Sequence, residues 1–497
     1  MRASRDRSGS DGGHAAAGDD GGDGGDGGDG TGAGVDADAG ADGGDGDGDG
    51  DGADGGNGGS RRAVAVVIAV VFLDLLGFGV VIPILPFYVR SFGVSDVFIG
   101  LIAATYSLAQ FLAAPTLGRI SDERGRRPVI AFSVAMAGVA WLVFGFATEV
   151  GAVAGTAAAV ATLLLSRTLA GAAGGNISAA QAYIADVTPR DRRAGALGLV
   201  GAAFSLGFVF GPALGGLAAS EEVVAGADAL LPAFVPTTRF TLPSFLAAGL
   251  SFLAAGAAVL VLREPERTRT PEAPRRSLVA QFRDALSDDA LRPLVASYFV
   301  ASVAFAGIQV MFIPFAADFY GYDATAAAVF LTYIGVLGTI NQGALVGPLE
   351  RRLGAVRLAG IGGSALAASL GLLPFTPQIG AALPLAGDPG SGLLSGALVT
   401  GPTVALFAVG ALLSFGNGAL NVSLSTLVSE RASDETQGAA FGVTQGAGSL
   451  GRTVGPPAAA AAYVLAYWSP FVAGAVLLVP VVWVLARGAA TEPAGAW

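Results

Sequence analysis

Long apolar runs, separated by short turns that carry arginine, make up most of this chain. Runs such as 97–117 and 128–147 have the length of about 20 residues that a helix needs to cross the hydrocarbon core of a bilayer. Hydrophobic residues account for 53% of the chain and charged residues for only 13%, which excludes an ordinary soluble domain. The sequence therefore predicts an all-α membrane protein that crosses the bilayer many times.

Twelve membrane spans are predicted from these runs. The first six cover residues 63–88, 97–117, 128–147, 158–186, 195–219 and 241–262, and the other six cover 293–317, 324–347, 357–375, 398–428, 438–465 and 468–486. With the N-terminus inside, 21 of the 28 arginines fall in cytoplasmic turns and only Arg90 and Arg239 in external loops. Because positive charge stays on the cytoplasmic side during insertion, we expect both termini to be cytoplasmic in a multi-pass plasma-membrane protein.

Three stretches interrupt the apolar pattern. Residues 1–60 contain fifteen Asp and three Arg, a charge of −12 that leaves +1 for the rest of a chain whose net charge is −11. This Gly/Asp-rich stretch has little apolar area to bury, so we expect a disordered cytoplasmic tail, with a calcium-binding Gly-Asp repeat as the alternative. Residues 263–292 hold seven arginines and are predicted to be a cytoplasmic linker, and residues 487–497 a short C-terminal tail.

The two sets of six spans match each other in register. Several glycines and prolines recur after 228 residues in the first span and after 244 residues in the fifth: Gly79, Pro86 and Gly93 as Gly307, Pro314 and Gly321, and Gly211-Pro212 as Gly455-Pro456. These offsets predict two pseudo-symmetric six-helix bundles, at residues 61–262 and 293–486. In such an architecture the substrate site lies near the bilayer midplane, between the two halves.

Several kinds of chemistry are missing from the sequence. The chain has no cysteine, and its one histidine, His14, lies in the tail. We find no nucleotide-binding loop, metal-ligand cluster or nucleophile arrangement. We therefore expect neither an enzyme nor an ATP-driven pump, and no metal or other cofactor.

Asp74 is the strongest single candidate for a functional residue. It lies in the middle of the first predicted span, about 18 Å beyond Arg62 at 1.5 Å per helical residue. A carboxylate at that depth is costly unless it faces a cavity, is protonated or has a partner, and such residues often carry protons. A purely structural ion pair is the alternative.

The turn at 118–127 contains four arginines between two apolar runs. Gly118 and Gly125 are expected to allow a tight reversal, Arg126 and Arg127 to hold the turn in the cytoplasm, and Asp122 to cap a helix of the opposite half near Gly438. A generic positive-inside turn is the plainer interpretation.

Two further patterns concern helix packing and polar contacts. Gly207, Gly211 and Gly215 recur every four residues beside Pro212, a spacing that brings two helices into backbone contact. Other polar residues lie within the predicted spans, and each either lines a polar cavity or binds a neighbouring helix; those selected for a substrate cavity are Tyr106, Gln110, Asn176, Gln309, Asn341 and Asn417.

Four stretches together resemble the major facilitator superfamily, and within it the twelve-span drug:proton antiporters such as the tetracycline efflux proteins. They are Leu73-Asp74-Leu-Leu-Gly77-Phe-Gly79, Gly118-Arg-Ile-Ser-Asp122 with Arg126-Arg127-Pro128, Arg167-Thr-Leu-Ala-Gly171, and Gly207-Phe-Val-Phe-Gly211-Pro212. The resemblance covers residues 61–490 and departs at Glu123, where the family's turn usually has a basic residue. It implies the major facilitator fold and transport driven by a proton gradient.

The resemblance also implies roles for individual residues. Arg167 would face the cavity and take part in proton coupling with Asp74, provided that the glycines at 171, 174 and 175 distort the fourth helix. An arginine bound to backbone carbonyls and water is the alternative. The stripe from Gly207 to Gly215 would be the antiporter signature, set at the interface between the halves.

These observations predict a proton-coupled exporter of a drug-like amphipathic compound such as a tetracycline. The same-class alternative is a transporter of a native metabolite, such as an organic acid, a lipid-like compound or a sugar. The expected partners are a small-molecule substrate, protons and the lipid bilayer, with no nucleic acid, and the expected state is a monomer.

Overall fold

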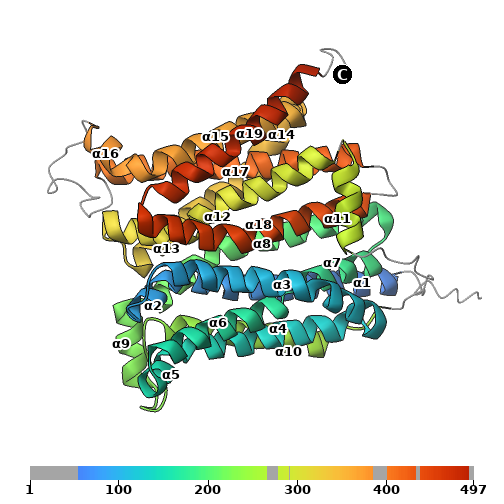
Figure 1. The fold of residues 1–497 in the computed structure, drawn as a ribbon. Helices are drawn as coiled ribbons and strands as arrows, with labels where there is room; N and C mark the ends of the chain where they lie inside the picture. The colour runs from blue at the N-terminus through green and yellow to red at the C-terminus, as the bar shows by residue number, and fades with distance from the viewer. Residues whose placement is uncertain (1–53, 266–277, 290, 384–399, 433–436, 492–497) are drawn as a thin grey trace, which may run out of the picture. The chain divides into compact units, whose positions relative to one another are not determined.

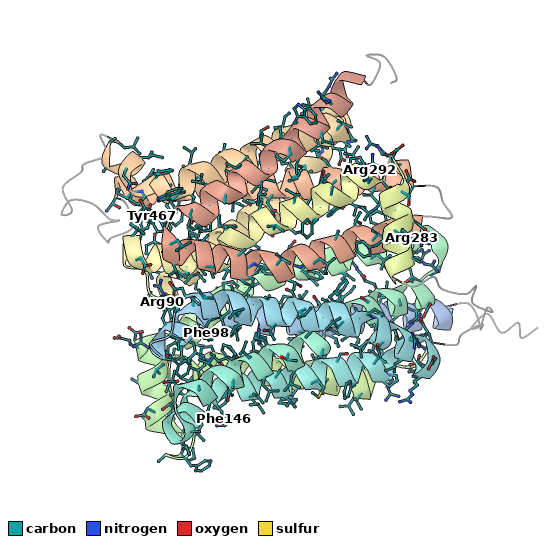
Figure 2. All side chains as sticks on the ribbon, viewed as in Figure 1. Arg90, Phe98, Phe146, Arg283, Arg292 and Tyr467 are labelled. Carbon is teal, nitrogen blue, oxygen red and sulfur yellow. The ribbon has the colours of Figure 1, made fainter. Side chains whose placement is uncertain are left out.

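The computed structural model describes residues 54–265, 278–289, 291–383, 400–432 and 437–491, and throughout these residues the regular secondary structure is helical. The long helices run side by side in one compact unit (Figure 1). Arg283 and Arg292 lie at one end of this bundle, which we call the arginine-rich end; Arg90, Phe146 and Tyr467 lie at the opposite end (Figure 2). Most of the predicted tail lies outside the described residues, as do large parts of the linker and of the C-terminal segment.

The first half contains the helices α1 to α10. Their bounds are α1 Asp54–Val81, α2 Leu85–Ser91, α3 Val97–Arg124, α4 Arg126–Gly145, α5 Ala147–Ala154, α6 Thr156–Ala172, α7 Asn176–Val187, α8 Arg190–Ala218, α9 Glu221–Leu230 and α10 Thr241–Val261. The described part of α1 thus begins within the stretch that the sequence assigned to the tail.

The second half begins with α11, which lies within the predicted linker. The bounds are α11 Leu278–Ser287, α12 Arg292–Tyr320, α13 Ala324–Ile340, a π-helix η1 Asn341–Leu345, α14 Val346–Leu353, α15 Ala355–Leu372, a 3₁₀ turn η2 Leu373–Phe375, α16 Thr376–Ala381, α17 Gly401–Arg431, α18 Gln437–Leu465 and α19 Ser469–Thr491. Among the described residues, eleven helical segments are long and apolar enough to span a bilayer. The helix of the predicted eleventh span, α18, is not among these eleven; it has 29 residues and includes Arg452 and several glycines.

Helix ends differ from the sequence expectations at three places. The first predicted span stops at Val81, and α2 restarts at Leu85 around two prolines. The fourth predicted span breaks at residues 173–175, as its glycines allow. The third difference is that α3 continues to Arg124, so Gly118 lies inside a helix and only Gly125 makes the reversal, with φ of +119°.

The glycine stripe of α8 packs against α1 of the same half. A Cβ atom built on Gly211 would lie 2.6 Å from Cα of Gly79, and one on Gly215 would lie 2.0 Å from the carbonyl oxygen of Val80. The expected placement of this stripe at the interface between the halves is therefore wrong. The three glycines lie on the side of α8 that faces α1. A different side of α8 faces the second half, where Gly216 meets Ala328 of α13.

The same kind of packing recurs in the second half. A Cβ atom on Gly455 of α18 would lie 2.5 Å from Cβ of Ala306 on α12, so α12 and α18 repeat the contact between α1 and α8. Between the halves, α3 meets α18, where a Cβ on Gly100 would lie 2.4 Å from the carbonyl oxygen of Pro456. Close backbone approach holds membrane helices together because lipid offers no hydrophobic drive for their association.

We expect Gly211→Ala to lower the free energy of unfolding by about 1–3 kcal/mol, because the new methyl group overlaps the backbone of α1. Gly201→Ala on the same helix is the matched control, since a Cβ there meets no atom within 4 Å. Reversible unfolding in detergent mixtures measures both values. Equal stabilities for the two variants would contradict this packing.

Candidate functional site

Asp74 of α1 lies in the interior of the bundle and has a specific partner. Nδ2 of Asn176 donates a hydrogen bond of 2.6 Å to Oδ2 of Asp74. Asn176 is the first residue of α7, directly after the break in the fourth span, and its side chain is buried. Asp74 is therefore bound at a point where a helix starts again.

The break between α6 and α7 packs closely against α3. A Cβ on Gly171 would lie 2.2 Å from the carbonyl oxygen of Tyr106, and one on Gly174 would lie 2.7 Å from Nε2 of Gln110. Gln110 Nε2 in turn donates to the Tyr106 hydroxyl oxygen over 3.4 Å. Larger residues at these positions would push α6 away from α3, so the glycines bring the polar groups of three helices together.

Arg167 of α6 lies in the same region, but its described partners are aromatic. Its Cζ atom is 4.1 Å from the ring centre of Trp141 and 5.2 Å from that of Phe144. Only 5% of the residue is exposed, and its Nε and Nη2 atoms are buried with no hydrogen-bond partner among the described residues. The expected pairing of Asp74 with Arg167 is not formed in this structure. The amide of Asn176 takes that place because the helix break turns it toward α1.

Arg452 of α18 brings a second positive charge to this region. The Tyr106 hydroxyl lies within electrostatic range of Asp74, Arg167 and Arg452, and Arg452 donates a 3.0 Å hydrogen bond to Ser449 on its own helix. Arg452 is not among the residues that the sequence analysis selected. Its position within a predicted span was the signal that could have selected it.

The polar residues of the second half that the sequence selected for a substrate cavity have no described contact with the group around Asp74. Asn341, at the start of the π-helix, donates a 3.3 Å hydrogen bond to Ser414, and Asn417 accepts one of 2.9 Å from Asn421. Gln309 lines a separate cavity of about 80 Å³ with phenylalanines of the second half. A π-turn within a helix frequently marks a functional position, which keeps Asn341 a candidate.

The turn after α3 is organised by a carboxylate that the sequence analysis missed. Glu264, which follows α10, accepts hydrogen bonds from the backbone amides of Arg126 (2.7 Å) and Arg127 (2.9 Å), the first residues of α4. Arg126 also pairs with Asp122 and, at 3.2 Å, with Asp186 at the end of α7. The described contacts of the turn thus tie parts of the first half together. Contact of Asp122 with the opposite half near Gly438 stays a prediction, and residues 433–436 before that helix lie outside the described part.

At the opposite end, an ionic network joins the two halves. Arg90 of α2 bonds Asp96 at 2.7 Å and Asp318 of α12 at 2.7 Å, and the Tyr463 hydroxyl of α18 donates to Asp318 at 2.8 Å. Although burial opposes its charge, the hydrogen bonds with Asp96 and Asp318 raise the pKa of Arg90 above its ordinary value. Arg90 and Asp318 occupy equivalent positions of the internal repeat, 228 residues apart.

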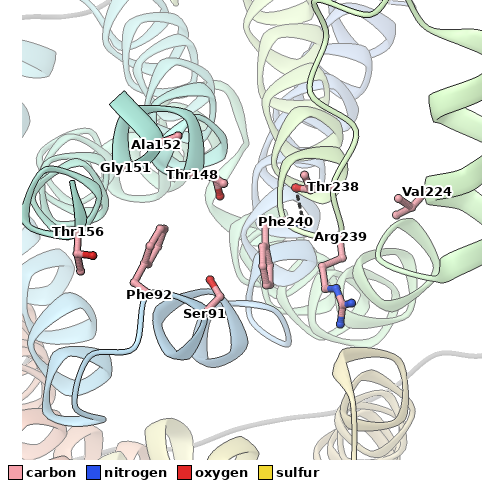
Figure 3. Close-up of a pocket in the computed structure, with 10 residues that line it drawn as sticks. All are labelled: Ser91, Phe92, Thr148, Gly151, Ala152, Thr156, Val224, Thr238, Arg239 and Phe240. Carbon is pink, nitrogen blue, oxygen red and sulfur yellow. Dashed lines mark hydrogen bonds between the residues drawn. The ribbon is translucent and has the colours of Figure 1, made fainter. Parts of the chain in front are cut away.

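A larger cavity, of about 560 Å³, lies at the opposite end of the first half (Figure 3). Its lining contains one charged residue, Arg239, with Phe92, Phe240 and small polar side chains. The group around Asp74 is the better candidate site, because it combines buried charge, amides and a helix break. No group of three or more His, Cys, Asp or Glu side chains that could hold a metal ion occurs among the described residues.

Comparisons with known proteins agree on one family. The model described as Major Facilitator Superfamily matches residues 67–404. Tetracycline resistance protein, class C, of Escherichia coli is 29% identical over 331 residues, which cover 66% of this chain and 77% of that protein. Multidrug resistance protein 1 of Bacillus subtilis (strain 168) is 29% identical over 300 residues, 58% of this chain and 67% of that protein. The crystal structure of the human organic anion transporter MFSD10 matches with a TM-score of 0.59 and 25% identity, covering 86% of this chain and 99% of that one.

We expect Gly125→Ala to destabilise the protein by about 1–3 kcal/mol, because the position needs a backbone conformation that only glycine adopts readily. The added methyl group would also lie 2.8 Å from the Glu264 carboxylate. Gly118→Ala is the matched control, since that glycine is helical with open space around it. Thermal unfolding in detergent compares them, and a loss of stability confined to Gly118→Ala would refute this assignment of the reversal.

The Arg90–Asp318 pair should show a coupling free energy of about 0.2–1 kcal/mol in a double-mutant cycle of Arg90→Gln and Asp318→Asn, because both side chains are partly exposed. The Arg292–Asp289 pair lies within one half with exposed fractions of 59% and 90%, so its coupling should be near zero. A larger coupling in the control pair would contradict a specific link between the halves.

Proposed function

Because the chain belongs to the major facilitator superfamily, we propose that this multi-pass transporter exports a drug-like amphipathic compound, such as a tetracycline, in exchange for protons. The observation that carries the proposal is the hydrogen bond between Asp74 and Asn176, placed where the fourth span breaks. The relatives that confer resistance to tetracycline and to multiple drugs support an export function. The arginine-rich end would face the cytoplasm with both chain termini, in a monomer of the plasma membrane.

Protonation of Asp74 would act on the helix break. A hydrogen bond to an ionised carboxylate is stronger than one to a neutral acid, so a proton on Asp74 weakens its hold on Asn176. Since Asn176 begins α7, the change reaches the joint between α6 and α7 directly. Arg167 lies on the other side of that joint, and its charge would bias the proton affinity of the region. Proton and substrate would thereby shift the balance between two conformations.

Ionic contacts at both ends of the bundle would limit how far the two halves rock against each other. The network of Arg90 and Asp318 joins the halves at the opposite end, which fits a state closed on that side. At the arginine-rich end, Asp122 would exchange Arg126 for a helix of the second half when the transporter closes there. The amides Gln110, Asn341 and Asn417 would contact substrate between the halves.

A second candidate is a transporter of a native organic acid. The observation favouring it is the excess of positive charge around Tyr106: Arg167, Arg452 and, among the described carboxylates, Asp74 lie within electrostatic range of its hydroxyl. The similarity to the human organic anion transporter supports this candidate.

We expect purified wild-type protein in detergent to release protons when a tetracycline or another amphipathic drug is added, and Asp74→Asn to release none. A pH-sensitive dye in weakly buffered solution measures the release. Asp289→Asn is the control, because that carboxylate is exposed near the start of α12. Release that persists in Asp74→Asn would make Asp74 structural. The absence of release with every compound would favour the organic-acid transporter.

A further inference from the structure

Arg167 is a buried cation that lacks an anion. Among the described residues, no carboxylate lies within 4 Å of its guanidinium, and Nε and Nη2 have no acceptor. The rings of Trp141 and Phe144 cover part of the guanidinium but accept no conventional hydrogen bond. Buried charges are normally paired, because their removal from water is costly. Arg167 is therefore available to an acceptor that the described residues do not supply.

Arg452 lies at a corresponding depth on the other half. Pro456 and Ala460, four and eight residues further along α18, both contact Gly100 of α3, so Arg452 shares the face of α18 that meets α3. Arg452 lies about 6 Å along α18 from Pro456, and Tyr106 lies about 9 Å along α3 from Gly100. Because α3 and α18 are antiparallel, both displacements point toward the same end of the bundle. The two side chains are therefore close enough to interact electrostatically.

The charges around Tyr106 do not balance. Asp74 is the one described carboxylate in electrostatic range of its hydroxyl, and Asn176 already binds it. At the position equivalent to Asp74, the second half has Ser302, which packs against Gly451 beside Arg452. Two cations and one carboxylate thus surround the Tyr106 hydroxyl, and a singly charged anionic ligand would balance them.

Aromatic rings surround the same place. The ring of Phe78, one turn beyond Asp74, lies 5.6 Å from Tyr106, 6.5 Å from Trp141 and 6.2 Å from Phe208 between ring centres. The Tyr106 hydroxyl accepts from Gln110, so its own proton is available to an acceptor. A ligand with an aromatic body would find stacking partners directly beside the two arginines.

We propose that Arg167 and Arg452, one from each half, bind the anionic group of an aromatic organic anion, with Tyr106 as a hydrogen-bond donor and Phe78 and Trp141 in contact with its ring. The site rests on the proposed transport function but on neither proton exchange nor the direction of transport. A ligand held by both arginines contacts both halves and favours the conformation that brings them together. Substrate recognition and the rocking of the halves are then parts of one binding event.

The test is calorimetric titration of the full chain, in detergent, with three probes of one shape: 1-naphthoate, neutral 1-naphthamide and cationic 1-naphthylmethylamine. Naphthoate should bind at least tenfold more tightly than the other two. Arg452→Gln and Arg167→Gln should each abolish this preference, and Arg452→Lys should keep part of it. Lack of saturable naphthoate binding, an equal affinity for the three probes, or a preference that survives both Gln variants would overturn the proposal.

Two controls separate this result from other effects. The first control is Arg487→Gln. Arg487 also stacks on a tryptophan, with its Cζ atom 3.6 Å from the ring centre of Trp483, but it lies at the exposed end of α19. This substitution should leave naphthoate binding unchanged. Gel filtration and melting curves establish that each variant is folded. Asp74→Asn should still bind naphthoate. Absence of drug-induced proton release from the wild-type protein, with naphthoate binding intact, would refute the exporter mechanism alone. Proton release by drugs without naphthoate binding would refute the anion site alone.

Discussion

Backbone-to-backbone contact at glycines is the constraint on which the rest of the structure depends. Within a bilayer, lipid tails are as apolar as the helices, so association relies on close van der Waals packing. Gly211 brings α8 onto α1, Gly171 brings α6 onto α3, and Gly100 brings α3 onto α18. Gly171 meets α3 at Tyr106, and Gly100 lies earlier on the same helix. Polar groups from both halves therefore meet around the Tyr106 side chain.

The charge arrangement follows from this packing and makes the interior unusual. A membrane protein tolerates few ionisable groups at depth, and those that remain usually have partners or a function. Among the described residues, Asp74 has such a partner in Asn176, whereas Arg167 contacts aromatic faces and Arg452 donates to a neighbouring serine. Positive charge is therefore in excess among the described groups around the Tyr106 hydroxyl.

The two ends of the bundle are held in different ways. At the arginine-rich end, Glu264 and Asp186 bind the turn after α3 within the first half. At the opposite end, Arg90 and Asp318 join the halves across the axis of the internal repeat. The described ion pairs thus link the two halves at the opposite end, whereas those of the turn after α3 lie within the first half.

The sequence by itself determined the helical class, the positions of most spans and the family, because apolar length, arginine placement and glycine motifs are local properties of the chain. It also indicated Asp74, Arg167 and the break near Gly174, since each departs from its surroundings within one span. Only the tertiary structure decided which groups meet: Asn176 rather than Arg167 at Asp74, Glu264 at the start of α4, and α1 rather than the other half against Gly211. These pairings depend on the rotation and depth of helices distant in sequence, which small packing contacts determine and no local pattern records.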